Sequence, residues 1–102
     1  MSFAEVEMQV IQWAEARKII PNSKPETQLL KMFSEAGELA DATIKRDMEQ
    51  IKDGVGDVLV CLINYCALQD IDLTECLALA YDEIKDRKGT LLANGVFVKE
   101  AK

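Results

Sequence analysis

The chain has 102 residues, of which 49% are hydrophobic and 29% are charged, and its formal net charge is −6. These values fit one globular domain over residues 1–102 and exclude an intrinsically disordered chain. The acidic balance argues against partners such as nucleic-acid polymers and anionic membranes. The sequence has no histidine, which excludes Ser-His-Asp and Cys-His catalysis and the usual histidine-based zinc sites.

The first predicted helix begins after Ser2, which can cap it together with Glu5 in a capping box. Apolar residues recur at helical spacing from Phe3 onward. This stripe includes Trp13, which we expect to pack in the core. The helix should end before Pro21, because the residue before a proline disfavours helical angles. Residues 20–24 then read as a loop.

A second helix is expected to begin at Pro25, since proline suits the first helical turn, and its apolar face extends to Ile44. A third helix should start at Asp47 and run to about Gln69. Glycines 37 and 56 lie inside these two helices. Because glycine inside a helix costs about 1 kcal/mol, we expect both of them to allow close approach of neighbouring helices.

Asp72 and Glu75 form a second capping box, which opens a fourth helix that should run to about Lys88. Gly89 is the expected C-cap of this helix. In the tail, Asn94-Gly95 indicates a turn, and residues 96–98 can form a loop, a short strand or a pinned arm. The pattern predicts an all-α fold, a bundle of four helices with a short C-terminal arm.

The three cysteines, Cys61, Cys66 and Cys76, form no C-x-x-C motif. We expect them to be reduced core residues and the chain to be cytoplasmic, because a buried thiol behaves as a small hydrophobe. No secretion signal is visible at the N-terminus. The apolar run over residues 58–68 is interrupted by Asn64 and is shorter than the roughly 20 residues that a bilayer requires.

Two pairs of carboxylates are the strongest indication of function in the sequence. Glu35 and Glu38 are three residues apart on the second helix, and Asp53 and Asp57 are four apart on the third, so that each pair shares one helix face. The stripe of Asp57 continues to Asn64 through mostly apolar sequence. Converging carboxylates repel one another, and a divalent cation with oxygen ligands removes this repulsion. The alternatives are that Asp57 pairs with a lysine or that the stripe faces solvent.

Several segments together resemble a known family. They are Gln-x-x-Lys-x-x-x-Glu-x-Gly-Glu-Leu at 28–39, Asp-Gly-Val-Gly-Asp-Val-Leu at 53–59, Lys-Asp-Arg-Lys-Gly at 85–89 and Asn-Gly-Val-Phe-Val-Lys at 94–99. Their order is similar to that of the MazG-like, all-α nucleoside triphosphate pyrophosphohydrolases, whose acidic pattern is E-x-x-E followed by E-x-x-D. Gly54 stands where this pattern has its third glutamate. Asp53, on the same helix face as Asp57, is the expected substitute.

The resemblance implies Mg²⁺-dependent hydrolysis, with Mn²⁺ as an alternative ion, of a (deoxy)nucleoside triphosphate to monophosphate and pyrophosphate. It implies catalytic roles for Glu35, Glu38 and Asp57, and metal ligation by these three residues and Asp53. The candidate substrate contacts are Lys31, Asn64, Lys85, Arg87, Lys88, Lys99 and Trp13. Each of these residues also has a structural interpretation, such as a solvated cation near a helix end or, for Asn64, a satisfied core amide.

The resemblance further implies a homodimer or homotetramer in which neighbouring chains complete the nucleotide pocket. A chain this small with long apolar helices is expected to self-associate on physical grounds as well. A dUTPase-like or phosphoribosyl-ATP-like specificity is compatible with the sequence. The alternative function is a catalytically inactive helical module that binds a partner protein, and Gly54 is the residue that keeps this alternative open.

Overall fold

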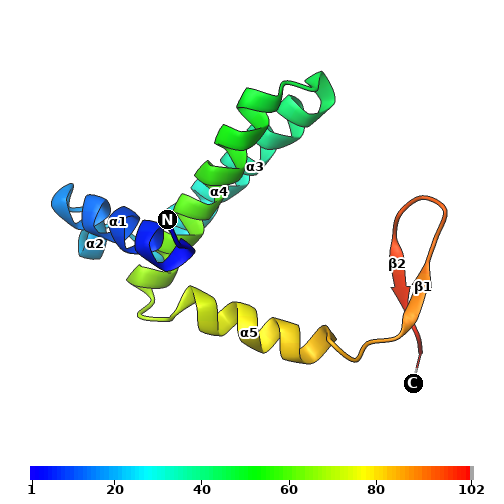
Figure 1. Cartoon of the computed structure of the whole chain (residues 1–102). Helices are drawn as coiled ribbons and strands as arrows, with labels where there is room; N and C mark the ends of the chain where they lie inside the picture. Colours follow the sequence, from blue (N-terminus) through cyan, green and yellow to red (C-terminus); the bar gives the residue numbers. More distant parts are fainter. Residues whose placement is uncertain (102) are drawn as a thin grey trace.

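The computed structural model describes residues 1–101 (Figure 1). Lys102, the last residue of the expected domain and tail, lies outside the described residues. The elements are α1 (Phe3–Ala16), α2 (Ile19–Asn22), α3 (Pro25–Lys45), α4 (Met48–Leu68), α5 (Leu73–Ile84), β1 (Gly89–Leu91) and β2 (Phe97–Lys99). The predicted all-α class and the four long helices are confirmed.

The helix starts follow the local signals in the sequence. The Ser2 hydroxyl oxygen accepts a hydrogen bond from the Glu5 backbone N–H at 3.2 Å, and Asp47 and Asp72 cap α4 and α5 in a similar way. Pro25 is the first residue of α3. These capping side chains satisfy backbone N–H groups that have no partner inside the helix.

Two predicted boundaries are wrong. Residues 20–24 are not simply a loop, because α2 closes one turn here and Ser23 N–H donates to the Ile19 carbonyl at 2.7 Å. α5 ends at Ile84 rather than near Lys88, and Gly89 is the first residue of β1 rather than a C-cap. A side chain at Gly89 would collide with the Val98 carbonyl oxygen and the Phe97 ring, so glycine is needed there for strand pairing.

α3 and α4 form an antiparallel hairpin of helices, and α1 crosses the C-terminal half of α4 (Figure 1). The buried apolar residues lie within these three helices, at Ala14, Ala42, Cys61, Ile63 and Cys66. The core of the single chain is therefore concentrated where α4 is covered by α3 and α1. This pair of long helices is the frame on which the acidic residues are placed.

Close approach of α3 and α4 occurs at Gly54 and not at the two glycines named from sequence. A β-carbon at Gly54 would lie 3.1 Å from the Leu39 Cβ, whereas none of the atoms around Gly37 or Gly56 lies within 4 Å of such a β-carbon. The predicted packing role of Gly37 and Gly56 is thus wrong for this chain. Gly54 is buried because the partner helix lies directly against its backbone.

α5 and the β1–β2 hairpin, which we call the arm (residues 73–99), project away from the other helices (Figure 1). α5 is bent by 103° relative to α4, and none of its residues is buried. The β1–β2 pairing is antiparallel, with Thr90 opposite Val98, and Gly95 at the turn has a φ of 87°. The expected packing of the fourth helix into a bundle is therefore not made within one chain.

The arm makes the chain more extended than a compact domain. The radius of gyration is 16.4 Å, against about 13 Å for a compact domain of 100 residues. Within residues 1–101 no single helix is long and apolar enough to cross a membrane, although the bent pair α4 and α5 passes the same test of length and composition when taken together.

The corners between helices share one backbone feature. Lys18 before α2, Arg46 between α3 and α4, and Asp70 between α4 and α5 all adopt a left-handed conformation, with φ values of 64°, 57° and 55°. Each reverses or redirects the chain within a few residues. L-residues rarely adopt this conformation, because the Cβ then crowds the following carbonyl oxygen.

Candidate functional site

A polar hollow lies between α3 and α4, on the side of this helix pair that carries most of its carboxylates. It has a volume of about 310 Å³ and is lined by Glu38, Asp41, Lys45, Gln50, Asp53, Gly54 and Asp57. We call it the acidic hollow. Three of the four carboxylates proposed from sequence, Glu38, Asp53 and Asp57, line it directly, so residues from both acidic motifs meet in one hollow.

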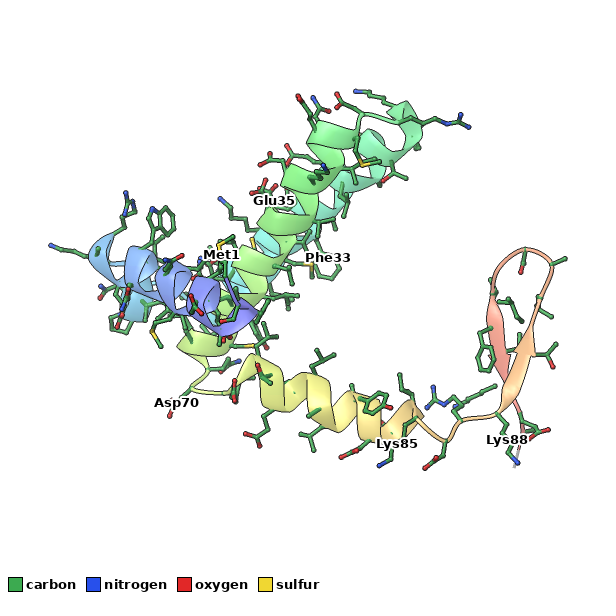
Figure 2. All side chains as sticks on the ribbon, in the orientation of Figure 1. Met1, Phe33, Glu35, Asp70, Lys85 and Lys88 are labelled. Atoms are coloured by element: carbon green, nitrogen blue, oxygen red, sulfur yellow. The ribbon has the colours of Figure 1, made fainter. Side chains whose placement is uncertain are left out.

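Glu35 lies half-buried beside this hollow, one helical turn before Glu38. Figure 2 shows Glu35 among a group of carboxylate oxygens on one side of the helix pair, whereas Phe33 projects on the other side. A hydrogen bond with Glu38 raises the pKa of Glu35, and burial and repulsion by Glu38 and Asp57 act in the same direction. The charge of Lys31 opposes these effects.

Glu35, Glu38 and Asp57 lie on one side of the helix pair, and repulsion among them favours the protonated form of Glu35. Two like charges on one site disfavour ionisation of both, so one proton is held between neighbouring carboxyl groups more readily than in water. Lys31 neutralises this charge only in part. The site therefore has more carboxylates than cationic groups on one face, and a divalent cation would complement this negative charge.

Cys61 lies beneath the cluster and is 2% exposed. Burial raises the pKa of its thiol, and the charges of Lys31, Glu35 and Asp57 also act on it. Cys61 is one helical turn after Asp57 on α4. Cys61 is the core residue expected from sequence, and its four-residue spacing from Asp57 also places both side chains on one face of α4.

Asn64 is 3% exposed, and its Oδ1 atom has no hydrogen-bond partner within residues 1–101. A buried polar atom without a partner is unfavourable by roughly 1–3 kcal/mol. The structural interpretation from sequence, in which Asn64 is a satisfied core amide, therefore does not account for this atom. Asn64 lies two helical turns beyond Asp57 on α4.

Trp13 is 45% exposed, so its predicted packing in the core is wrong for the single chain. The Arg17 guanidinium lies over the indole ring, 4.6 Å from its centroid. The indole is thus held by a cation–π contact at the surface. Its stacking role remains a prediction.

The basic candidates near the C-terminus do not join the acidic hollow of their own chain. Lys85 lies at the end of α5, where its Nζ pairs with the Asp82 carboxylate at 3.2 Å. Arg87, Lys88 and Lys99 are exposed and line a separate hollow at the base of the β1–β2 hairpin. Figure 2 places Lys85 and Lys88 on the arm, away from Glu35.

The structure also adds residues that the motifs did not include. Asp41 and Gln50 line the acidic hollow together with Lys45. Asp41 continues the three-residue spacing of Glu35 and Glu38, which is the signal that would have identified it. Gln50 lies in the first turn of α4 and becomes a lining residue only because α3 and α4 are antiparallel, which no local pattern indicates.

Within the described residues 1–101, no three Asp, Glu, Cys or His side chains are close enough together to hold a metal ion as they stand. Glu38 and Asp53 are exposed, so their side chains are free to change rotamer. The donors that share this face are carboxylate oxygens, which are the ligands that Mg²⁺ and Mn²⁺ prefer. The chemistry of the donor set therefore fits a hard divalent cation.

Comparison with known proteins supports the same fold. A cyanophage S-2L MazG-like pyrophosphohydrolase, solved with dGDP and three catalytic Mn²⁺ ions per active site, is similar with a TM-score of 0.72 and 22% identity. The similarity covers 100% of this chain and 96% of that chain. At this level of identity the likeness shows a shared fold.

A sequence relative is an uncharacterized 18.2 kDa protein from the rep-hol intergenic region of Haemophilus phage HP1. It is 36% identical over 61 residues, which are 60% of this chain and 37% of the phage protein. The match therefore spans little more than a third of that relative's length.

The family model that matches is described as the MazG nucleotide pyrophosphohydrolase domain, and it covers residues 23–91. These residues comprise α3, α4, α5 and β1, and thus both the acidic hollow and most of the arm. Because the match extends over most of the chain and includes both acidic motifs, the chain belongs to the MazG nucleotide pyrophosphohydrolase domain family.

Proposed function

We propose that the protein is a Mg²⁺-dependent nucleoside triphosphate pyrophosphohydrolase, which converts a (deoxy)nucleoside triphosphate to its monophosphate and pyrophosphate. The observation that carries this proposal is the acidic hollow, which Glu38 on α3 and Asp53 and Asp57 on α4 line together, with Glu35 beside them. It indicates carboxylates that are placed close together without enough positive charge to balance them. Family membership supports the reaction, and the nucleotide and Mn²⁺ bound by the cyanophage protein support a nucleotide substrate.

Glu35, Glu38 and Asp57 are the proposed catalytic residues and metal ligands, with Asp53 as a fourth ligand in place of the family glutamate at position 54. When bound, Mg²⁺ or Mn²⁺ would neutralise phosphate oxygens and lower the pKa of a water molecule. The carboxylates hold and orient the attacking water by accepting its hydrogen bonds. Asp53 has a shorter side chain than glutamate but lines the hollow directly.

Outside the arm, the proposed substrate contacts are Lys31, Asn64 and Trp13. Lys31 lies close enough to Glu35 to influence its pKa, which suits a cation that binds phosphate at the edge of the hollow. The unpartnered Oδ1 of Asn64 can accept a hydrogen bond from a sugar hydroxyl or a base. The exposed Trp13 ring offers a face for base stacking, worth roughly 1–3 kcal/mol per base in other proteins.

A second copy of the chain is the proposed partner, in a homodimer or homotetramer. α5 exposes Leu77, Leu79, Tyr81 and Ile84, and the hairpin exposes further large apolar side chains. Monomers rarely leave so large an apolar surface uncovered. Arg87 and Lys88 on the arm complement the charge of the acidic hollow, so we infer that the arm of one copy reaches the nucleotide site of another.

A cytoplasmic location is part of the proposal. It is supported by three cysteines that form no disulfide with one another, as expected for a reducing compartment. An acidic chain of this kind reaches its anionic substrate through the bound metal rather than through its net charge.

The test is a panel of common and modified nucleoside triphosphates, each incubated with Mg²⁺ or Mn²⁺ and assayed for pyrophosphate release. The proposed function predicts release from at least one nucleotide, and a metal-dependent rise in melting temperature with that nucleotide. The alternative function, an inactive helical module that binds a protein partner, predicts neither result. Absence of both across the panel would favour this alternative.

A further inference from the structure

The α3–α4 helix pair has an apolar face on the side opposite to the acidic hollow. We call it the back face, and its residues recur at helical spacing, with Leu29, Phe33, Ala40 and Ile44 on α3 and Met48, Val55 and Leu59 on α4. Phe33 lies two residues before Glu35, a spacing that rotates the side chain by about 200° around the helix. The same spacing separates Val55 from Asp57 on α4. Figure 2 shows Phe33 projecting away from the carboxylates around Glu35.

The back face is uncovered in the single chain. Phe33 is 63% exposed, Ile44 80% and Met48 60%. The face extends over residues 29–44 of α3, about 22 Å at 1.5 Å per residue, and its width of two helices is about 20 Å. Its footprint is thus on the order of 400 Å², a size at which an apolar patch commonly marks an interaction site. A stable dimer needs roughly 800 Å² per partner, so a second surface is required.

The arm supplies this second surface, and its length fits the thickness of one helix pair. α5 is bent by 103° relative to α4, and Figure 2 shows the arm extending toward the side on which Phe33 projects. α5 has 12 residues and is therefore about 18 Å long, whereas packed helices lie about 8–10 Å apart. It is long enough to pass a second helix pair stacked on the back face. Leu77 and Tyr81, which are 69% and 61% exposed, are available for contact with that pair.

The positions of the hollow and of the arm determine how a second copy is oriented. The acidic hollow is lined by Asp41, Lys45 and Gln50, close to the turn between α3 and α4, whereas α5 leaves the opposite end of α4. An arm can therefore reach the hollow of a second copy when the two helix pairs are antiparallel. Arg87 and Lys88 follow α5 directly, and within residues 1–101 neither forms an ion pair.

We propose that two copies of the chain associate back face to back face with their helix pairs antiparallel, so that each α5 crosses the partner's helix pair and places Arg87 and Lys88 beside the partner's acidic hollow. The hollow opens away from the back face, which is the side that the end of α5 reaches. The inference deepens the proposed function and rests on it for the role of the arm. A two-fold axis makes both contacts twice.

The first experiment measures the oligomeric state of the full chain by analytical ultracentrifugation, without nucleotide. Phe33→Lys and Val55→Lys should each raise the dissociation constant of the dimer by at least 100-fold, because each substitution occurs twice in the interface and buries unpaired charges. The matched control is Met8→Lys on α1, whose side chain is 53% exposed and lies outside the back face. Circular dichroism checks that each variant keeps its helices. A monomeric wild-type chain, or a dimer that survives both back-face substitutions, would overturn the proposal.

The second experiment tests the antiparallel arrangement. Chains labelled with ¹⁵N and unlabelled chains are unfolded together, refolded and treated with a carbodiimide, which joins a lysine amine to a carboxylate that it contacts. Peptide mapping should find Lys88 linked to Glu38, Asp41 or Asp53, with one peptide labelled and the other unlabelled. Lys88→Arg keeps the charge and should abolish these links. Links of Lys88 to these carboxylates only within one chain, or none to them, would contradict the proposed pairing.

Failure of this inference can be distinguished from failure of the proposed function, because neither experiment requires turnover. A dimer that loses association on back-face substitution and gives the mixed-isotope links supports the inference even if no nucleotide is hydrolysed. An active chain that remains a monomer overturns the inference and leaves the proposed hydrolysis standing.

Discussion

The α3–α4 hairpin and the arm contain similar proportions of apolar residues but bury them differently. The helix pair buries Ala42, Cys61 and Ile63, while α5 and the β1–β2 hairpin have no buried residue. α5 begins at a local signal, its Asp72 cap, although none of its residues is buried in its own chain. Capping signals in the sequence thus specify helix starts locally, whereas the surface that covers a helix can belong to another molecule.

The two regions also differ in the charges that line their hollows. Glu38, Asp53 and Asp57 line the hollow on the helix pair, whereas Arg87 and Lys88 share the hollow on the arm with acidic residues such as Glu83. A triphosphate needs both a metal held by carboxylates and direct cationic contacts. If the two charge sets serve one site, the association of chains is a condition for activity. The following experiments test this division of roles.

The largest effect is expected at the acidic hollow. Asp57→Asn keeps the shape of the side chain and removes its charge, so turnover should fall by on the order of 100-fold or more. The stability of the metal-free protein should stay the same or increase, because repulsion with Glu35 is relieved. The control is Asp82→Asn, which removes an exposed carboxylate on the arm. A large loss of metal-free stability in Asp57→Asn would instead indicate a structural ion pair.

The next experiment mixes two variants to test whether the acidic hollow of one chain works together with the arm of another. Asp57→Asn and the double variant Arg87→Ala/Lys88→Ala should each have low activity alone. After the two proteins are unfolded together and refolded, activity should recover, because a mixed dimer combines an intact acidic hollow with an intact arm. Analytical ultracentrifugation checks that both variants associate. Associated but inactive mixtures would show that the arm serves only the site of its own chain or none.

The stability of the metal-free protein should depend on pH through Glu35. Because the pKa of Glu35 is raised in the folded protein, the native state binds a proton more tightly than the unfolded state. Its stabilising contribution is present at low pH and is lost as pH rises through the raised pKa. Metal-free protein should therefore lose stability over this range, and Glu35→Gln should reduce the slope.

Added Mg²⁺ should reverse this trend, because its ligands must be deprotonated. At 100 times its dissociation constant, the ion would raise the free energy of unfolding by about 2.7 kcal/mol. Thermal unfolding at several pH values, with and without Mg²⁺, measures the effect. An Mg²⁺-induced shift that is equally large at low pH, or that persists in Asp57→Asn, would place the ion elsewhere.

The smallest expected effect concerns the contact between α3 and α4. Gly54→Ala gains helix propensity of about 1 kcal/mol, but its methyl group crowds Leu39, and overpacking costs about 1–3 kcal/mol. Gly56→Ala has the same propensity gain and meets open space. Gly54→Ala should therefore be less stable than Gly56→Ala in chemical denaturation. Equal stabilities would show that Leu39 moves aside freely.

Much of the secondary structure could be predicted because its signals are local. Ser2, Asp47 and Asp72 cap their helices as expected, and Pro25 begins α3. The acidic motifs could be paired because helical spacing puts each on one face. The single-domain organisation over residues 1–102 stays a prediction.

The wrong predictions have a different cause, because each concerns a residue whose contacts depend on parts of the chain that are distant in sequence. Trp13 lies on an apolar stripe of α1 but is 45% exposed in the single chain. Gly54, rather than Gly37 or Gly56, meets the facing helix because of the relative offset of α3 and α4. The end of α5 could not be predicted because strand pairing at Gly89 competes with helix extension. None of these outcomes is visible in a local pattern.

The left-handed corners at Lys18, Arg46 and Asp70 have a consequence for engineering a more robust protein. Each non-glycine residue in this conformation is disfavoured by roughly 1–2 kcal/mol, and glycine would relieve this strain at a backbone-entropy cost of about 0.5–1 kcal/mol. Lys18→Gly and Arg46→Gly offer thermal stability at positions outside the catalytic apparatus. Asp70→Gly would relieve the same backbone strain but would also make the connection between α4 and the arm more flexible. A thermostable design should therefore leave this third corner unchanged.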